Sequence, residues 1–88
     1  MILGKVKGMV VSTRKNELLV GNKFLIIKPL DKNNKAEFVA IDNVGAGIGE
    51  TVIIATGSAA RVGCGMANAP VDAAVVGIVD EGQAIIED

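Results

Sequence analysis

Short runs of apolar residues, separated by polar turns, dominate the hydropathy pattern of this chain. The runs are rich in Val, Ile and Phe and show almost no helical periodicity, which favours β-strands over helices. Pro29 cannot donate a hydrogen bond within a central strand, so the second run either ends at Pro29 or lies on an edge. The predicted strands are 6–11, 18–30, 37–44, 50–56 and 72–80, with 83–88 as a continuation of the last.

The segments between these runs carry residues typical of turns. Residues 12–16 and 31–35 are polar, so each predicts a turn, and the second predicts a hairpin. Residues 58–61 predict a short helical turn with Ser58 as its N-cap, and the segment that follows predicts irregular structure. Five short strands joined by turns predict a single all-β domain over residues 1–88, folded as a small closed or nearly closed barrel.

The composition suggests that such a barrel needs support from outside its own core. Half of the 88 residues are apolar, but only two are aromatic, and Val, Ile and Ala supply most of the apolar content. A domain of this length buries a small share of its surface and is only marginally stable alone. A single cysteine, Cys64, and no histidine exclude an internal disulfide and argue against a tetrahedral zinc site. We therefore expect the surplus apolar surface to lie in an interface between copies of the chain.

Charge and terminal sequence narrow the choice of partners. The formal net charge of −1 gives the chain no overall electrostatic attraction to nucleic acid. No apolar run approaches the roughly 20 residues of a membrane helix, and the first residues lack the pattern of a signal peptide. A single unpaired cysteine suits a reducing compartment. We therefore expect a soluble cytoplasmic protein that binds neither nucleic acid nor a membrane.

The densest glycine cluster lies in the segment DNVGAGIGETVIIATGSAAR at positions 42–61. Gly45, Gly47 and Gly49 alternate, as glycines do at the start of a dinucleotide-binding loop. That motif, however, needs a glycine at its sixth position and a helix after it. Here the sixth position is Glu50 and the following residues predict a strand. We interpret the cluster as an extended segment whose bare face lets another backbone approach closely.

No set of side chains in this sequence is arranged for catalysis. Ser58 has no histidine and no evident base beside it, so it is a weak candidate nucleophile. The start of the short helix could bind an anion with help from Arg61. A capped turn in which Arg61 pairs with a carboxylate is the better interpretation. Cys64 is expected to be a small buried or loop residue. We expect no enzymatic activity, no cofactor and no bound metal.

Two binding functions compete with a structural one. A nucleic-acid-binding barrel needs aromatic side chains stacked over a basic groove, which two Phe residues and a net charge of −1 do not supply. A carrier domain holds lipoate or biotin on a lysine at a hairpin tip, and Asp31-Lys32 matches that arrangement at two positions only. Salt-dependent binding would indicate the first function, and a prosthetic-group mass on Lys32 would indicate the second.

Five ordered blocks of the sequence resemble the pentameric vertex proteins of bacterial microcompartment shells. The blocks are LGKVKGMVVSTRK (3–15), KPLD (28–31), VAIDNVGAGIGETV (39–52), GSAAR (57–61) and PVDAAVVGIVD (70–80). The resemblance covers nearly the whole chain, and five blocks in one order are more specific than any single motif. The segment around Cys64 and the short hairpin at 31–37 depart from the family pattern, so Cys64 is given no role.

The resemblance implies a fold and a function that the residue pattern alone does not reach. It implies a five-stranded OB-like closed barrel with one short helix, assembling as a cyclic homopentamer. Such pentamers cap the vertices of a polyhedral shell in the bacterial cytoplasm, where they meet hexameric and pseudohexameric shell proteins. The shell encloses enzymes, and the vertex subunit itself catalyses nothing. The shared blocks do not distinguish a carboxysome from a compartment that degrades ethanolamine or propanediol.

The resemblance also suggests where the subunits meet. We expect the GSAAR block near the five-fold axis, with Gly57, Ser58 and Ala59 small enough to leave a narrow opening. A cyclic ring joins one patch of each subunit to a different patch on the next. Five copies of Arg61 could place positive charge near this opening, or could brace the interface by pairing with a carboxylate of the neighbour. We favour bracing, because like charges around a tight ring repel. The expected interface residues are Gly45, Gly47, Gly49, Glu50 and Arg61.

Overall fold

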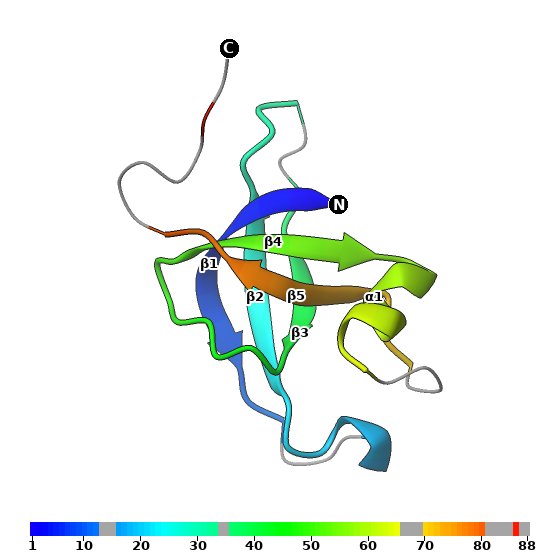
Figure 1. Cartoon of the computed structure of the whole chain (residues 1–88). Coiled ribbons are helices and arrows are strands. Elements are labelled where there is room, and N and C mark those ends of the chain that lie inside the picture. Colours follow the sequence, from blue (N-terminus) through cyan, green and yellow to red (C-terminus); the bar gives the residue numbers. More distant parts are fainter. Residues whose placement is uncertain (13–15, 34–35, 66–69, 81–85, 87–88) are drawn as a thin grey trace.

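Five short strands close into a barrel in the computed structural model, which describes residues 1–12, 16–33, 36–65, 70–80 and 86. The strands follow one another around the barrel in the order β1-β2-β3-β5-β4 (Figure 1). The elements are β1 (Ile2–Val10), the 3-10 helix η1 (Glu17–Leu19), β2 (Lys23–Pro29), β3 (Phe38–Asp42), β4 (Thr51–Thr56), α1 (Ser58–Gly63) and β5 (Ala73–Ile78). The predicted fold, a small five-stranded closed barrel with one short helix, is confirmed.

Strand β1 closes the barrel because it pairs with two neighbours at once. Residues 2–5 form an antiparallel ladder with β4, and residues 4–10 form another with β2. The register with β2 shifts between Val6 and Gly8, and such a bulge bends a strand. Gly4 lies where the two ladders overlap. A Cβ at this position would collide with the side chain of Ile27, so only glycine fits this close approach.

The opposite side of the barrel is a much thinner seam. Strands β3 and β5 run parallel there, and their register is defined by one pair, Ile41 with Ala74. The other four strand pairs are antiparallel and have longer ladders. The sheet is therefore mixed, and its weakest lateral junction lies at β3–β5.

Aliphatic side chains fill the interior of the barrel. Val6, Leu25, Ile27, Val52, Ile54 and Val75 are the largest apolar side chains that are fully buried. Each strand alternates inward and outward residues, so every second position contributes to this core. The volume inside a barrel of this size is filled by side chains and leaves no room for a ligand.

A second, smaller cluster joins α1 to the outside of the barrel. It consists of Ile41, Ala60, Cys64, Val71 and Ala74, with Leu19 packed against it. Cys64 is buried, as expected, and its Sγ lies 3.6 Å from the carbonyl oxygen of Arg61. No helix in the described part of the chain is long and apolar enough to cross a membrane.

The boundaries of the first two strands differ from the sequence-based prediction. Strand β1 begins at Ile2 instead of residue 6, because its first residues pair with β4. Strand β2 begins at Lys23 instead of residue 18, because the side chain of Asn16 accepts a hydrogen bond from the Leu18 N–H at 2.9 Å and starts η1. Strand β2 ends at Pro29, which is one of the two alternatives predicted for this proline.

The remaining predicted elements differ less. Strands β3, β4 and β5 lie inside the predicted ranges and are each shorter by one to three residues at one or both ends. Residues 13–15 and 34–35 of the two predicted turns lie outside the described residues, as do 66–69 of the irregular segment. The predicted continuation of the last strand lies outside them too, except for residue 86, which is not in a strand.

Two adjacent isoleucines in β4 test whether the inward face carries the stability. Ile54 is fully buried, whereas the neighbouring Ile53 is only partly buried. We expect Ile54→Ala to reduce the free energy of unfolding by about 2–5 kcal/mol, because it removes buried methyl groups and leaves a cavity. Ile53→Ala should cost clearly less. Urea unfolding at one fixed protein concentration measures both variants. An equal loss for the two would contradict this assignment of faces.

Candidate functional site

The loop between β3 and β4 is organised by one buried carboxylate. Asp42, the last residue of β3, is 1% exposed. Its Oδ1 accepts hydrogen bonds from the N–H groups of Val44 at 2.8 Å and Gly45 at 3.2 Å. Its Oδ2 accepts from Gly45 at 3.3 Å and from Ala46 at 2.8 Å. Three consecutive backbone N–H groups thus converge on one side chain, which fixes the path of the loop.

The glycines of this loop serve a turn, and the predicted extended segment is wrong. Residues 43–50 contain no strand. Gly45 has a φ of 104° and Gly49 a φ of 91°, both in the left-handed region that side chains disfavour. The chain bends at residues 43–44 and turns at residues 48–49, so the alternation of glycines does not present a bare strand face.

Glu50 closes the far end of the same loop. Its Oε1 accepts a hydrogen bond from the Gly47 N–H at 2.6 Å, which is short, as expected for an ionised acceptor. The Gly49 N–H donates to the Val6 carbonyl at 2.8 Å, and the Val6 N–H donates to the Glu50 carbonyl at 2.9 Å. The loop is therefore attached to β1 by its backbone. The side chain of Ala46 packs into the barrel core, whereas those of Val44 and Ile48 lie on the surface. Ile48 is 65% exposed.

The GSAAR block forms the start of α1, but its cap is not the predicted one. Gly57 is the N-cap residue, with φ 64° and ψ −144°, and no side chain caps the helix. Ser58 is the first helical residue, so the prediction of Ser58 as N-cap is wrong. The Gly57 N–H donates to the Asp72 carbonyl at 2.8 Å, which ties the start of the helix to the segment before β5. Gly57, Ser58 and Ala59 are all exposed.

Arg61 lies half-buried on α1 and contacts its own chain. Its Nη1 donates to the Val71 carbonyl oxygen at 3.3 Å. Within the described residues, Arg61 makes no ion pair with a carboxylate. The guanidinium keeps further donors beyond this one bond, since it carries five N–H groups.

Strand β4 separates the two groups of predicted site residues. The loop with Gly45, Gly47, Gly49 and Glu50 precedes β4, and the block with Gly57 and Arg61 follows it. Figure 1 shows the loop at the lower left of the barrel and α1 at the right. The structure does not bring the two groups together in one subunit. They form two separate surfaces.

Neither surface is equipped for chemistry on a substrate. The described residues contain no group of His, Cys, Asp and Glu side chains that could hold a metal ion. Lys32 lies in the exposed turn after β2, where the Asn33 N–H donates to Asp31 Oδ1 at 2.9 Å. The aromatic pair does not form a platform for bases, because Phe38 packs against the core and both rings are partly buried.

Comparison with known proteins identifies the family. The family model described as "Ethanolamine utilisation protein EutN/carboxysome" matches residues 1–80. The shell vertex protein GrpN of Rhodospirillum rubrum is 51% identical over 83 residues, which cover 91% of this chain and 93% of GrpN. The carboxysome shell vertex protein CcmL of Gloeobacter violaceus is 45% identical over 83 residues, covering 91% of this chain and 83% of CcmL. The chain belongs to the EutN/carboxysome family.

A solved structure supports the same relationship at the level of the fold. The pentameric microcompartment shell protein GrpN from Rhodospirillum rubrum superimposes with a TM-score of 0.80 at 46% identity, covering 97% of this chain and 100% of GrpN. The chain is thus a shell vertex protein of bacterial microcompartments or carboxysomes, and the family is structural and non-enzymatic. The family resemblance inferred from the five sequence blocks is confirmed.

Asp42 is the residue of this vertex protein that the sequence-based prediction missed. Two residues separate Asp42 from Gly45, and an Asp shortly before a glycine is a signal for a turn in which the side chain accepts backbone N–H groups. The interpretation of the cluster as an extended segment left no place for such a turn.

The role of Asp42 in the vertex protein can be tested by removing one acceptor oxygen. In Asp42→Asn an amide NH₂ faces backbone N–H groups, so at least one donor that is buried or partly buried loses its partner. We expect the free energy of unfolding to fall by about 2 kcal/mol or more. Asp31→Asn is the matched control, because Asp31 makes one exposed turn bond that an Asn side chain can also make. It should change stability by less than about 0.5 kcal/mol. Urea unfolding measures the free energy of unfolding of both variants. An equal decrease for Asp42→Asn and Asp31→Asn would contradict the role assigned to Asp42.

Proposed function

We propose that five copies of this chain close into a ring that fills a vertex of a polyhedral shell. The outer rim of the ring then meets the hexameric and pseudohexameric proteins that form the facets. The proposal is carried by the similarity to pentameric GrpN, which extends over 97% of this chain and all of GrpN. A subunit of the same fold and length has the shape that a five-membered ring requires.

The distribution of apolar side chains supports assembly. Several aliphatic residues of the described part lie at the surface, among them Val39, Val44, Ile48 and Val62. Ile48 and Val44 belong to the loop that Asp42 holds in place, so their positions are fixed before another subunit arrives. Apolar groups in a preorganised loop lose little conformational entropy on binding.

We assign the surroundings of the five-fold axis to Gly57, Ser58 and Ala59. All three residues are small and exposed at the start of α1. Five copies of a small residue can approach an axis closely and still leave a narrow opening. We assign the subunit interface to the loop of Gly45, Gly47, Gly49 and Glu50, together with Arg61. The loop and Arg61 lie on separate surfaces, which suits a ring in which unlike patches meet.

Native mass spectrometry tests the ring directly. At micromolar concentration and moderate salt, the dominant species should be a five-fold multiple of the 9.0 kDa subunit. The surplus apolar surface makes the assembled state the more stable one. A clean monomer under these conditions would reject the proposed function, because a single copy cannot close a vertex.

Arg61→Ala tests the bracing role of the guanidinium. The variant should assemble only at a concentration about tenfold or more above that of the parent, a loss of about 1.4 kcal/mol per tenfold. Lys32→Ala removes an exposed cation from a turn and should assemble like the parent. Mass spectra across a dilution series give the result, and circular dichroism confirms that the dissociated Arg61→Ala subunit is folded. Assembly of Arg61→Ala at the parent's concentration would remove Arg61 from the interface.

A further inference from the structure

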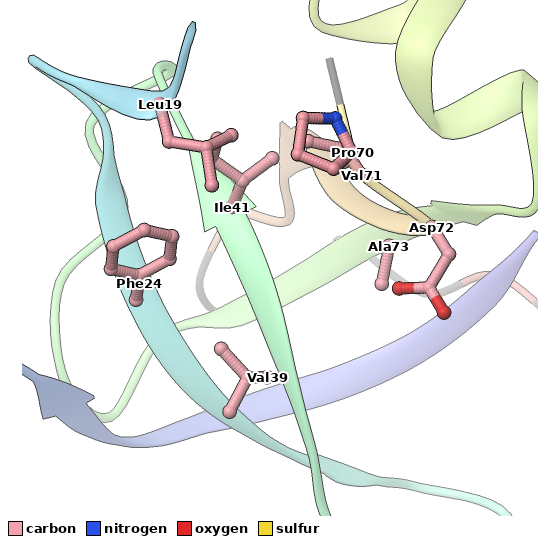
Figure 2. A pocket seen from close by; sticks show the side chains of 8 residues that line it. All are labelled: Leu19, Phe24, Val39, Ile41, Pro70, Val71, Asp72 and Ala73. Atoms are coloured by element: carbon pink, nitrogen blue, oxygen red, sulfur yellow. The ribbon is translucent and has the colours of Figure 1, made fainter. Parts of the chain in front are cut away.

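A shallow apolar groove runs along the thin seam between β3 and β5. One part of it is a hollow of about 130 Å³. Figure 2 shows side chains of β2 and β3 on one side of this hollow and the segment that leads into β5 on the other. The lining residues are Leu19, Phe24, Val39, Ile41, Pro70, Val71, Asp72 and Ala73.

The groove continues toward the start of α1. A second hollow of about 350 Å³ shares Val39, Asp72 and Ala73 with the first. Its lining also includes Ile2, Phe38, Thr56 and Gly57. The two hollows therefore form one continuous depression, which leads from η1 to the block that we place near the five-fold axis.

The strands that form one wall of this groove are apolar on their outer face, as expected for a face that is covered by another surface. An antiparallel strand with one solvated face alternates apolar and polar residues. In β2 the inward residues Leu25 and Ile27 are apolar, and so are Phe24 and Ile26 on the outer face. Strand β3 continues this outer face, since Ile26 pairs with Val39. Val39 is nevertheless 49% exposed in the single subunit.

We propose that this groove is one half of the contact between neighbouring subunits, and that a second copy of this chain covers it. The inference rests on the proposed pentamer and extends it to a surface that the sequence did not indicate. In the ring, Val39 and Phe24 are then excluded from water by the next subunit.

The position of Gly57 is the first argument for a second copy. Surface that flanks a five-fold axis faces a neighbouring subunit, because five copies share the space around the axis. Gly57 lines the second hollow, and the first hollow adjoins it along the β3–β5 seam through the shared residues Val39, Asp72 and Ala73. If Gly57 lies near the axis, a groove that begins there lies against the next copy.

Charge is the second argument. The carboxylate of Asp72 makes no hydrogen bond or ion pair with the described residues, yet it stands in the middle of the groove. Lys5 and Lys28 lie directly opposite each other on β1 and β2, and neither forms an ion pair within the described part of the chain. Like charges in such a pair repel. In the closed strand order, β1 lies across the barrel from the β3–β5 seam. Each subunit thus carries the Asp72 carboxylate in the groove and the Lys5 and Lys28 ammonium groups on the other side of the barrel. These opposite charges can attract each other between neighbouring copies.

A small-molecule ligand fits the groove less well. Ligand sites combine an apolar wall with several converging polar groups that orient the ligand. The side chains lining both hollows are apolar except for those of Thr56 and Asp72. Such a surface suits the aliphatic side chains of another subunit.

Thiol labelling of the assembled ring tests the inference. We compare Val39→Cys with Lys32→Cys, using the parent chain as the blank because its Cys64 is buried. A single subunit leaves position 39 half-exposed, so any strong protection in the ring comes from a neighbour. In a ring identified by native mass spectrometry, a maleimide should modify Val39→Cys at least about tenfold more slowly than Lys32→Cys.

A second pair of variants covers the case in which a cysteine is tolerated poorly. Val39→Asp places a charge in the groove and should leave a folded monomer, whereas Leu30→Asp, at a similar exposure of 45%, should still assemble. The groove is not in the interface if Val39→Cys reacts as fast as Lys32→Cys in an intact ring, or if Val39→Asp assembles like the parent. Either result rejects this inference but leaves the proposed pentamer unaffected. If the parent chain itself is monomeric, the proposed function and this inference fail together.

Discussion

The barrel depends on one strand, β1, being shared between two hydrogen-bonded ladders. Its first half pairs with β4 and its second half with β2, and the two ladders overlap at Gly4 and Lys5. Because this overlap brings β1 close to Ile27, a side chain at position 4 would force the ladders apart. The closure in turn fixes β4, so the loop before it and the helix after it emerge at opposite ends of one short strand.

A closed barrel of this size has too small an interior for the apolar residues of the chain. The interior holds one set of aliphatic side chains, and α1 covers a second, smaller set. The outer faces of β2 and β3 remain apolar without a cover from their own subunit. Folding and assembly are then thermodynamically linked. A neighbouring subunit that binds only the folded chain also stabilises the folded state against unfolding. This linkage explains how a family of about this chain length forms the corners of a protein shell.

Local rules were sufficient for much of the fold. Apolar runs rich in Val, Ile and Phe, with turn residues between them, predicted five strands, and the end of β2 at Pro29 was one of two alternatives. Cys64 was expected to be a small buried or loop residue, and it is buried. The start of β1 could not be predicted, because its pairing partner in β4 lies about 50 positions further along the chain. The five ordered blocks identified the family, which no single motif did.

The structure of the β3–β4 loop, the start of α1 and the apolar groove could be predicted less well from the sequence. Glycine allows backbone conformations that other residues disfavour, but the sequence does not tell whether it is extended or has a positive φ. Gly45 and Gly49 have a positive φ. Gly57 and Ser58 are both acceptable N-caps, and the hydrogen bond from Gly57 to Asp72 selects the first. The apolar groove combines residues from η1, β2, β3 and the segment before β5, so it exists only once the barrel has closed.

The attachment of the β3–β4 loop has a consequence for how such a protein changes during evolution. Asp42 holds the loop through backbone N–H groups, which every residue except proline supplies. The side chain of Ala46 packs into the core, but those of Val44 and Ile48 do not take part in the anchoring. The exposed ones, Val44 and Ile48, can therefore be exchanged without changing the course of the loop. A lineage can in this way change the apolar surface that the loop presents while the backbone of the loop keeps its path.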